Sequence, residues 1–159
     1  MRIIQMLPVF TVGDAIGNDV VAVYGILKEL GYETHIYAEI IDERLKACDP
    51  KDYRLYEDRE DDIILYHLST GSALNTIVCR YKAHLIVVYH NITPPGFMEG
   101  WNMEAARSCS KGLRAARYMA KKAEYVIADS EYNLNELRSM GYDCGGRVLP
   151  ILIPFSDYD

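Results

Sequence analysis

The sequence contains no apolar run approaching the roughly 20 residues needed to cross a bilayer, so we expect no membrane-spanning helix. It also lacks an excess of basic residues, because 17 Lys and Arg stand against 23 Asp and Glu, a formal net charge of −6. An acidic chain of this kind does not favour nucleic acid as a partner. Pro8 interrupts the short apolar stretch at the start, which is not the pattern of a secretory signal.

Cysteines are few and show no pattern. The four of them are far apart, with no Cys-x-x-Cys pair, so neither a disulfide framework nor a zinc site is predicted. The Gly-x-Gly-x-x-Gly fingerprint of dinucleotide-binding oxidoreductases is missing, as is the Gly-x-Ser-x-Gly elbow of serine hydrolases. We therefore expect a reduced, cytoplasmic protein with no bound metal and no permanently bound cofactor.

The 159 residues suit one domain, and short apolar strands alternate with amphipathic helices along them. Strands are expected at residues 3–9, 33–38, 62–67, 84–90, 124–128 and 147–153. Helices are expected from a cap at Asn18 or Asp19 to Gly31, over 73–82 and 103–123, and from a cap at Ser130 to Gly141. Several strands are apolar at nearly every position, which is typical of strands buried on both faces. The pattern predicts an α/β fold with a doubly wound, mostly parallel sheet and helices on both faces.

Two acidic stretches are predicted to be exposed. Residues 42–60 are rich in charge and are expected to be irregular, with a short edge strand at 53–55. Asp61 and Asp62 precede an apolar strand and are expected to form its solvated start.

In such sheets ligands bind beyond the carboxyl ends of the strands. Polar segments follow several predicted strands: residues 13–19, 67–72, 90–93 and 129–131. Gly13 and Gly17 allow a tight turn at a helix N-terminus, which suits a phosphate or a sugar oxygen, although a simple turn explains them equally well. His67 and His90 each end an apolar strand, either as hydrogen-bonded histidines that shape the rim or as residues that meet a ligand.

Two further features lie outside this rim. Trp101 is the only tryptophan, and it either offers an aromatic wall to an acceptor or anchors the helix that follows. The long helix carries small residues on one face and Arg107, Lys111, Arg114 and Lys121 on the other. Such a basic face either contacts anionic lipids or is an ordinary solvated surface.

In this order and spacing, five segments resemble the N-terminal domain of retaining family-4 glycosyltransferases of the GT-B fold. They are Gly13-Asp14-Ala15-Ile16-Gly17-Asn18-Asp19, Leu30-Gly31-Tyr32, Tyr89-His90-Asn91-Ile92-Thr93-Pro94-Pro95, Ala128-Asp129-Ser130-Glu131-Tyr132-Asn133 and Leu149-Pro150-Ile151-Leu152. The resemblance implies that residues 1–153 form a Rossmann-like, acceptor-side domain and that 154–159 begin a linker to a donor-binding domain. The family's paired glutamates and its diphosphate-binding basic residue belong to that second domain, so the 159 residues alone are expected to be inactive.

The resemblance also implies roles for individual residues. The loop Gly13, Asp14, Ala15, Ile16, Gly17 and Asn18 would lie against the donor phosphates and the reacting sugar, although it lacks the adjacent glycine pair of many relatives. His90 would line the cleft beside the transferred sugar. The acceptor side would be formed by His67, Ser69, Gly71, Asn91, Thr93, Ser130 and Trp101. The implied partners are a nucleotide sugar and a sugar or lipid-linked acceptor. The basic helix face, as a separate inference from its residues, would give peripheral contact at the inner face of the membrane.

A stand-alone, flavodoxin-like nucleotide- or small-molecule-binding module is the alternative. A receiver domain of this type needs an acidic cluster at the end of the first strand, where Leu7-Pro8-Val9-Phe10 stands instead. A flavin-binding protein needs a hydroxyl-rich phosphate loop, for which only Thr11 is available.

Overall fold

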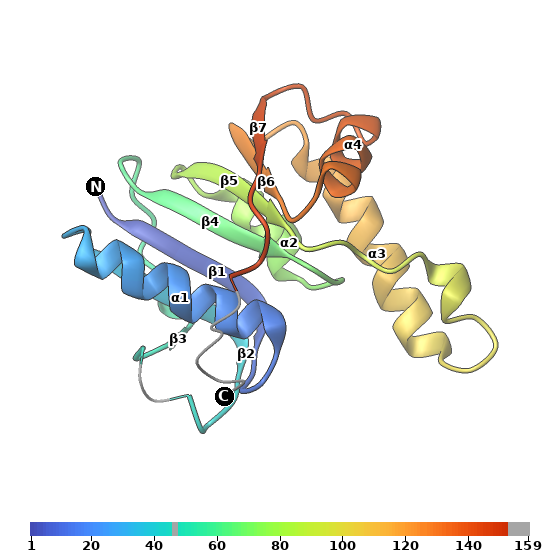
Figure 1. Ribbon diagram of the computed structural model, residues 1–159, viewed down its shortest axis with the longest axis horizontal. Helices are drawn as coiled ribbons and strands as arrows, with labels where there is room; N and C mark the ends of the chain where they lie inside the picture. Colours follow the sequence, from blue (N-terminus) through green and yellow to red (C-terminus); the bar gives the residue numbers. More distant parts are fainter. Residues whose placement is uncertain (46–47, 153–159) are drawn as a thin grey trace.

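Figure 1 shows the computed structural model, which describes residues 1–45 and 48–152, so the predicted linker at 154–159 lies outside the described residues. The strands are β1 (Ile3–Phe10), β2 (Thr34–Ile41), β3 (Lys51–Asp52), β4 (Ile63–Leu68), β5 (His84–Tyr89), β6 (Tyr125–Ala128) and β7 (Gly145–Val148). The α-helices are α1 (Ala15–Glu29), α2 (Leu74–Ile77), α3 (Met103–Met119) and α4 (Glu131–Ser139). Three 3₁₀ turns are η1 (Tyr53–Leu55), η2 (Val78–Arg80) and η3 (Pro95–Phe97). Among these residues no helix combines the length and apolarity that crossing a bilayer requires.

The strands form one parallel sheet in the order β3-β2-β1-β4-β5-β6-β7. The chain adds strands outward from β1 to β3 and then returns to β4 on the other side of β1. The strand order therefore reverses between β1 and β4. Right-handed crossovers then place α1 on one face and α2, α3 and α4 on the other. The predicted doubly wound α/β fold is confirmed. Without the two-residue β3, the strands run β2-β1-β4-β5-β6-β7, which is the flavodoxin-like order 2-1-3-4-5 with one strand added. β3 extends this sheet to the order 3-2-1-4-5-6 of the Rossmann fold.

Each face of the sheet has its own apolar core. Under α1 lies a small cluster that includes Leu7, Phe10 and Val20. On the other face a larger cluster joins β4 and β5 to α3 and α4, with Tyr66 and Tyr89 among its fully buried side chains. Because side chains alternate along a strand, the residues of one strand divide between the two faces.

The first helix begins earlier than predicted. Its N-cap is Asp14, whose side chain accepts a hydrogen bond from the Gly17 amide at 3.2 Å, and neither Asn18 nor Asp19 caps it. Asp14 competes successfully because it is the first residue after the turn at Gly13 whose side chain can cap the helix. Asp19 consequently lies inside α1 on its buried side. Gly31, at φ 82°, ends the helix as predicted.

Other boundaries also differ from the predictions. The edge strand is Lys51–Asp52, and the expected strand at 53–55 is the 3₁₀ turn η1, capped by the Asp52 side chain. The helix expected over 73–82 is α2 followed by η2, and α3 ends at Met119 rather than at residue 123. The last strand ends at Val148 because Pro150 has no N–H for the ladder. Residue 153, the predicted end of that strand, lies outside the described residues.

Asp62 is not solvated, contrary to the prediction. It is fully buried, with its Oδ2 2.5 Å from Arg2 Nη2 and 2.9 Å from the Tyr56 hydroxyl. The Arg2 guanidinium is buried as well. Asp61 is exposed, as predicted, and pairs with the N-terminal amine. The acidic pair therefore divides between solvent and core because consecutive side chains point in opposite directions.

Candidate functional site

A row of hydrogen-bonded polar side chains crosses four neighbouring strands, β1, β4, β5 and β6, at the point where the strand order reverses. Gln5 lies on β1 and His67 on β4, whereas His90 and Asp129 directly follow β5 and β6. Nε2 of His67 is 3.0 Å from Gln5 Oε1, Nδ1 of His67 is 2.8 Å from His90 Nε2, and His90 Nδ1 is 3.0 Å from Asp129 Oδ2. The row lies on the α1 face of the sheet, because Gln5 also bonds to the Val20 carbonyl in α1.

The partners of this row fix where its protons lie. Gln5 donates through Nε2 to the Val20 carbonyl at 2.9 Å, so its oxygen faces His67 and His67 Nε2 must carry the N–H. His67 Nδ1 is then an acceptor and receives the N–H of His90 Nε2. The other ring nitrogen of His90, Nδ1, faces the Asp129 carboxylate at 3.0 Å, so the row ends on an acidic side chain.

The row is enclosed. The side chains of His67 and His90 are each 1 % exposed. Burial, reinforced by the charge of His90, lowers the pKa of His67 well below its ordinary value of 6.5, in agreement with the neutral ring that the hydrogen bonds require. After β7 the chain runs back to α1 (Figure 1), where the Leu152 amide donates to Asp19 Oδ1 at 2.9 Å. His90 thus lies behind this segment and not in an open cleft.

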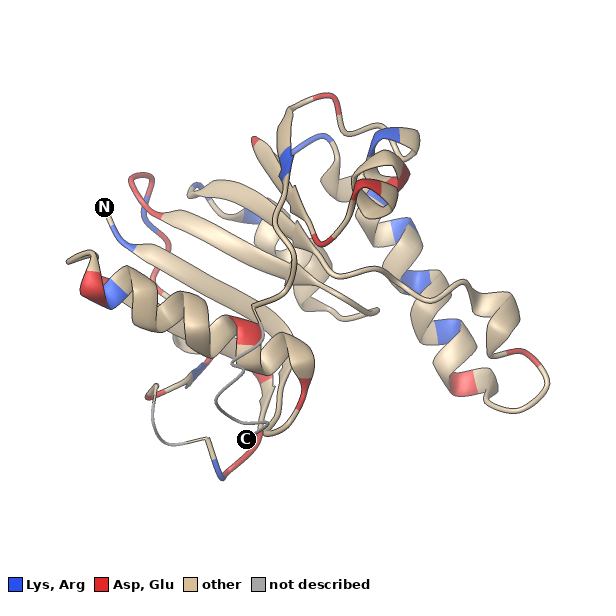
Figure 2. Cartoon of the chain, in the orientation of Figure 1, with Lys and Arg blue, Asp and Glu red and all other residues tan. Residues whose placement is uncertain are grey.

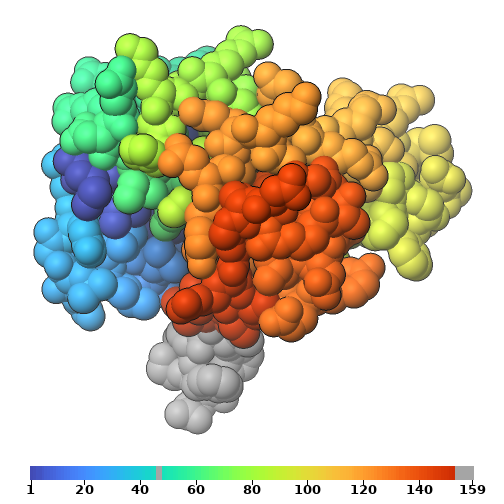
Figure 3. All heavy atoms as spheres, turned by 90° about the horizontal axis from the view of Figure 1, so that it is seen from above, coloured from blue at the N-terminus to red at the C-terminus, as the bar shows by residue number. Residues whose placement is uncertain are grey.

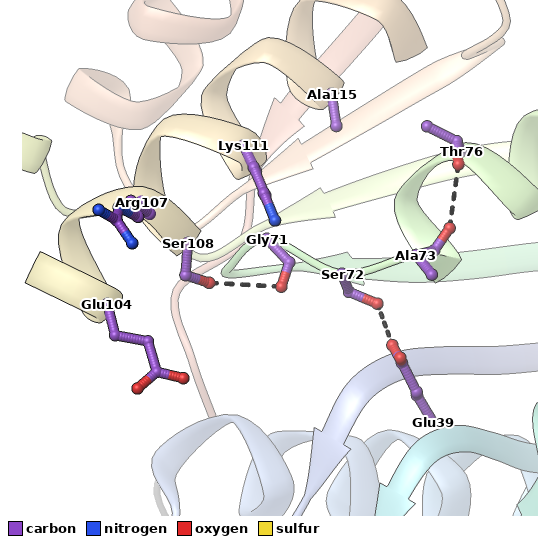
Figure 4. Close-up of a pocket in the computed structure, with 10 residues that line it drawn as sticks. All are labelled: Glu39, Gly71, Ser72, Ala73, Thr76, Glu104, Arg107, Ser108, Lys111 and Ala115. Carbon is purple, nitrogen blue, oxygen red and sulfur yellow. Dashed lines mark hydrogen bonds between the residues drawn. The ribbon is translucent and has the colours of Figure 1, made fainter.

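An open cleft lies on the opposite face, between the loop after β4 and the first half of α3 (Figure 4). Its volume is about 890 Å³, which is in the range of small-molecule sites. Its polar lining comprises Glu39, Ser72, Thr76, Glu104, Arg107, Ser108 and Lys111. Glu39, near the end of β2, accepts a hydrogen bond from the Ser72 hydroxyl. Carboxylates, hydroxyls and two cations around one hollow suit a hydroxyl-rich ligand that carries negative charge.

The predicted phosphate loop has the geometry of a close-approach turn. Gly13 has φ 78°, which favours glycine, and a Cβ on Gly17 would lie 2.6 Å from the Thr11 carbonyl oxygen. Gly17 is buried against β1, whereas Gly13, Ala15 and Asn18 are exposed. The loop therefore presents the N-terminus of α1 to solvent at the carboxyl edge of the sheet.

Among the predicted acceptor-side residues, only Gly71 lines the cleft. Ser130 is the N-cap of α4, where its hydroxyl accepts from the Asn133 amide at 3.1 Å. Asn91 and Thr93 are exposed, and Asn91 has the left-handed φ of 68°. Trp101 is 72 % exposed, so it does not anchor α3, and its indole N–H donates to the Phe97 carbonyl at 2.9 Å. His67 and Ser69 do not line the cleft either.

Sequence reasoning missed several residues of both sites. Gln5 carried a usable signal, because it is the one polar side chain within Ile3-Ile4-Gln5-Met6-Leu7. Glu39, Glu104 and Ser108 carried none, since nothing in their local sequence shows that β2 and α3 face the same hollow. Lys and Arg residues occur at several places along α3 (Figure 2). Arg107 and Lys111 were singled out as part of a basic face, and they line the cleft (Figure 4).

Comparison of the chain with models of known protein families found no match, and comparison with curated proteins found none either.

Proposed function

We propose that this chain is the acceptor-side half of a glycosyltransferase that takes a sugar from a nucleotide-sugar donor, with retention of configuration. The observation that carries the proposal is the cleft of about 890 Å³ at the carboxyl edge of a doubly wound sheet. Ligands of such sheets bind at that edge, near the point of reversal.

In this proposal the cleft binds the acceptor. Glu39 and Glu104 accept hydrogen bonds from sugar hydroxyls. The carboxylate of Glu39 accepts a hydrogen bond of the same kind from the Ser72 hydroxyl. Arg107 and Lys111 hold an anionic group, such as the phosphate of a lipid-linked acceptor. Mixed charge of this kind does not suit a purely apolar ligand, because each buried charge would be left without a partner.

The donor would meet the loop from Gly13 to Gly17. The N-terminus of α1 and its helix dipole would stabilise the negative charge that develops on the diphosphate as it leaves the sugar. His90, held by Asp129, would fix the rim beside the transferred sugar. The residues that hold the nucleotide itself are expected, from the resemblance, in a second domain.

Binding to the 159-residue chain tests the acceptor site. We expect sugar phosphates to raise the thermal midpoint, and Glu104→Gln and Lys111→Gln to weaken that binding about tenfold each, as loss of a charge-assisted hydrogen bond does. Glu60→Gln is the matched control, because Glu60 is exposed and remote from the cleft lining. Strong stabilisation by nucleoside diphosphates with no response to sugar phosphates would favour the nucleotide-binding module instead.

Transfer itself is tested with the natural gene product. We expect it to move labelled sugar from a nucleotide sugar to an acceptor, and the 159-residue chain alone to show no turnover. Robust turnover by the 159 residues would contradict the proposal that the nucleotide is held by a second domain. Retention is tested by comparing the anomeric configuration of donor and product by NMR.

A further inference from the structure

Three side chains of types that can bind metal ions lie close together where the strand order reverses. Each of Asp19, His67 and His90 offers one donor atom, and these atoms lie within 4.8 Å of one another. They come from α1, from β4 and from the residue after β5, so the fold, and not local sequence, brings them together. All three side chains are almost inaccessible to solvent.

One nitrogen of each imidazole points at the facing nitrogen of the other ring. Their planes differ by 3° and their centroids are 5.1 Å apart, while the facing nitrogens are only 2.8 Å apart. The rings therefore meet edge to edge, with the His67 Nδ1 and His90 Nε2 lone-pair positions directed into the gap between them. A single proton occupies that gap.

The outer nitrogens of both rings already have the partners that metal-bound histidines have. His67 Nε2–H donates to Gln5 Oε1, and Gln5 is itself fixed by the Val20 carbonyl. His90 Nδ1 faces the Asp129 carboxylate at 3.0 Å. Such outer partners set the tautomer and orientation of the ring and raise its basicity toward a metal. Every buried imidazole needs hydrogen-bond partners, and here they are of the kinds that metal-bound histidines also use.

We propose that Asp19, His67 and His90 form a site for a divalent transition-metal ion of the Zn²⁺ class. Two imidazoles and one carboxylate are a ligand set that zinc accepts, leaving a fourth position for water or another donor. The ion would lie between the two imidazoles, with one nitrogen of each ring and one carboxylate oxygen facing it.

Closing the site requires both rings to move. Four-coordinate zinc with bonds of about 2.0–2.1 Å places its ligands about 3.4 Å apart. The histidine nitrogens must therefore separate by about half an ångström. Both rings must also tilt, because their facing nitrogens point at each other and the ion would lie beside the line that joins them. The Asp19 carboxylate must turn inward. Asp19 Oδ1 accepts from the Leu152 amide, so an ion here would also tie residues 149–152 to the sheet. The site is independent of the proposed transfer reaction and stands or falls on metal binding alone.

Titration of the metal-stripped 159-residue chain with Zn²⁺ tests the proposal. We expect one ion per chain and a higher thermal midpoint. Co²⁺ gives a second readout, because nitrogen and oxygen ligands produce visible d–d bands without the intense thiolate bands that the four free cysteines would add. No stoichiometric Zn²⁺ binding, or thiolate bands with Co²⁺, would overturn the proposal.

The ligands are tested one at a time. Asp19→Asn preserves shape and the acceptor for Leu152, and it is expected to weaken binding at least tenfold; His90→Gln and His67→Gln are expected to abolish it. Asp129→Asn, one shell further out, should weaken it about 10–100-fold. His84→Gln is the matched control, because His84 pairs with Glu124 at the surface. Should either buried histidine variant fail to fold, Asp19→Asn and Asp129→Asn still decide, and binding unchanged in both would overturn the site.

Discussion

The backbone of Gly112 in α3 lies directly against the backbone of Gly71 in the loop after β4. A Cβ on Gly112 would be 2.9 Å from the Gly71 nitrogen and 3.0 Å from the Thr70 carbonyl carbon. A Cβ on Gly71 would in turn strike the Ser108 carbonyl. This approach holds the two walls of the candidate acceptor cleft together, since Gly71 and Ser108 both line it.

Gly112→Ala is therefore expected to destabilise the protein by about 1–3 kcal/mol, because the neighbours are backbone atoms that cannot move aside cheaply. Helix propensity alone predicts the opposite sign, a gain of roughly 0.5–1 kcal/mol. Gly25→Ala is the matched control, since Gly25 lies inside α1 with nothing within 4 Å of an added Cβ. Urea unfolding measures both, and a stabilised Gly112→Ala would show that the close approach is not tight.

Asp62→Asn is expected to cost about 3–5 kcal/mol, because it leaves the buried Arg2 guanidinium without its counter-charge. The Tyr56 hydroxyl would also lose a charged acceptor. Asp61→Asn, next in sequence and exposed, should change the urea midpoint little. Equal effects of the two substitutions would mean that the buried pair contributes nothing beyond ordinary surface charge.

The same carboxylate makes stability depend on pH. Burial disfavours its charge, but hydrogen bonds from Arg2 and Tyr56 outweigh burial and hold the pKa of Asp62 below its ordinary value of 3.8. A lowered folded-state pKa means that this stabilisation is fully present above the unfolded pKa. It is lost as the pH falls through the lowered, folded one. Thermal midpoints measured between about pH 6 and pH 2 should therefore fall less steeply for Asp62→Asn than for the wild type, and parallel curves would contradict this.

The fold was predictable because its signals are local and repeated. Strands such as Ile63–Leu68 are apolar at every position but His67, and the turns at Gly31 and Gly141 end their helices with the left-handed φ that favours glycine. The N-cap of α1 was mispredicted because Asp14, Asn18 and Asp19 are all good caps. Only the turn at Gly13 decides between them.

The sites were less predictable because they depend on pairing across the sheet. His67 and His90 were placed correctly at the carboxyl edge, but their mutual hydrogen bond follows from strand register, which one sequence does not encode locally. Glu39 joins the cleft because side chains alternate along β2, leaving it on the face opposite Ala38. Ser130 was predicted both as a helix cap and as an acceptor-side residue. The structure confirms the cap, and the acceptor-side role stays a prediction.

Ser130→Ala distinguishes the capping role of Ser130 from its predicted acceptor-side role. Loss of the N-cap is expected to cost about 1 kcal/mol, and Ser130→Asp should retain most of it, because a carboxylate also accepts from the Asn133 amide. Sugar-phosphate binding in the cleft should be the same in both variants, measured by thermal shift relative to each variant's own midpoint. Weaker binding with unchanged stability would return Ser130 to the acceptor site.

The predicted lipid contact can be tested at the segment that precedes α3. Phe97 and Trp101 are 74 % and 72 % exposed, and in the space-filling view this segment forms one end of the protein (Figure 3). Arg114 is exposed in the second half of α3 and Lys121 is exposed just after the helix, both outside the cleft lining. Exposed aromatic and basic side chains are the features that peripheral contact with anionic lipid uses.

Trp101 is the only tryptophan, so its fluorescence reports this contact without interference. We expect a blue shift with vesicles rich in anionic lipid and none with neutral vesicles. Arg114→Gln and Lys121→Gln should each weaken vesicle binding about fivefold in a flotation assay, because each basic residue near such a surface contributes roughly 1 kcal/mol. Lys28→Gln, an exposed cation at the end of α1, is the matched control and should leave binding unchanged. An unshifted Trp101 spectrum at high anionic lipid would leave the basic face as an ordinary solvated surface.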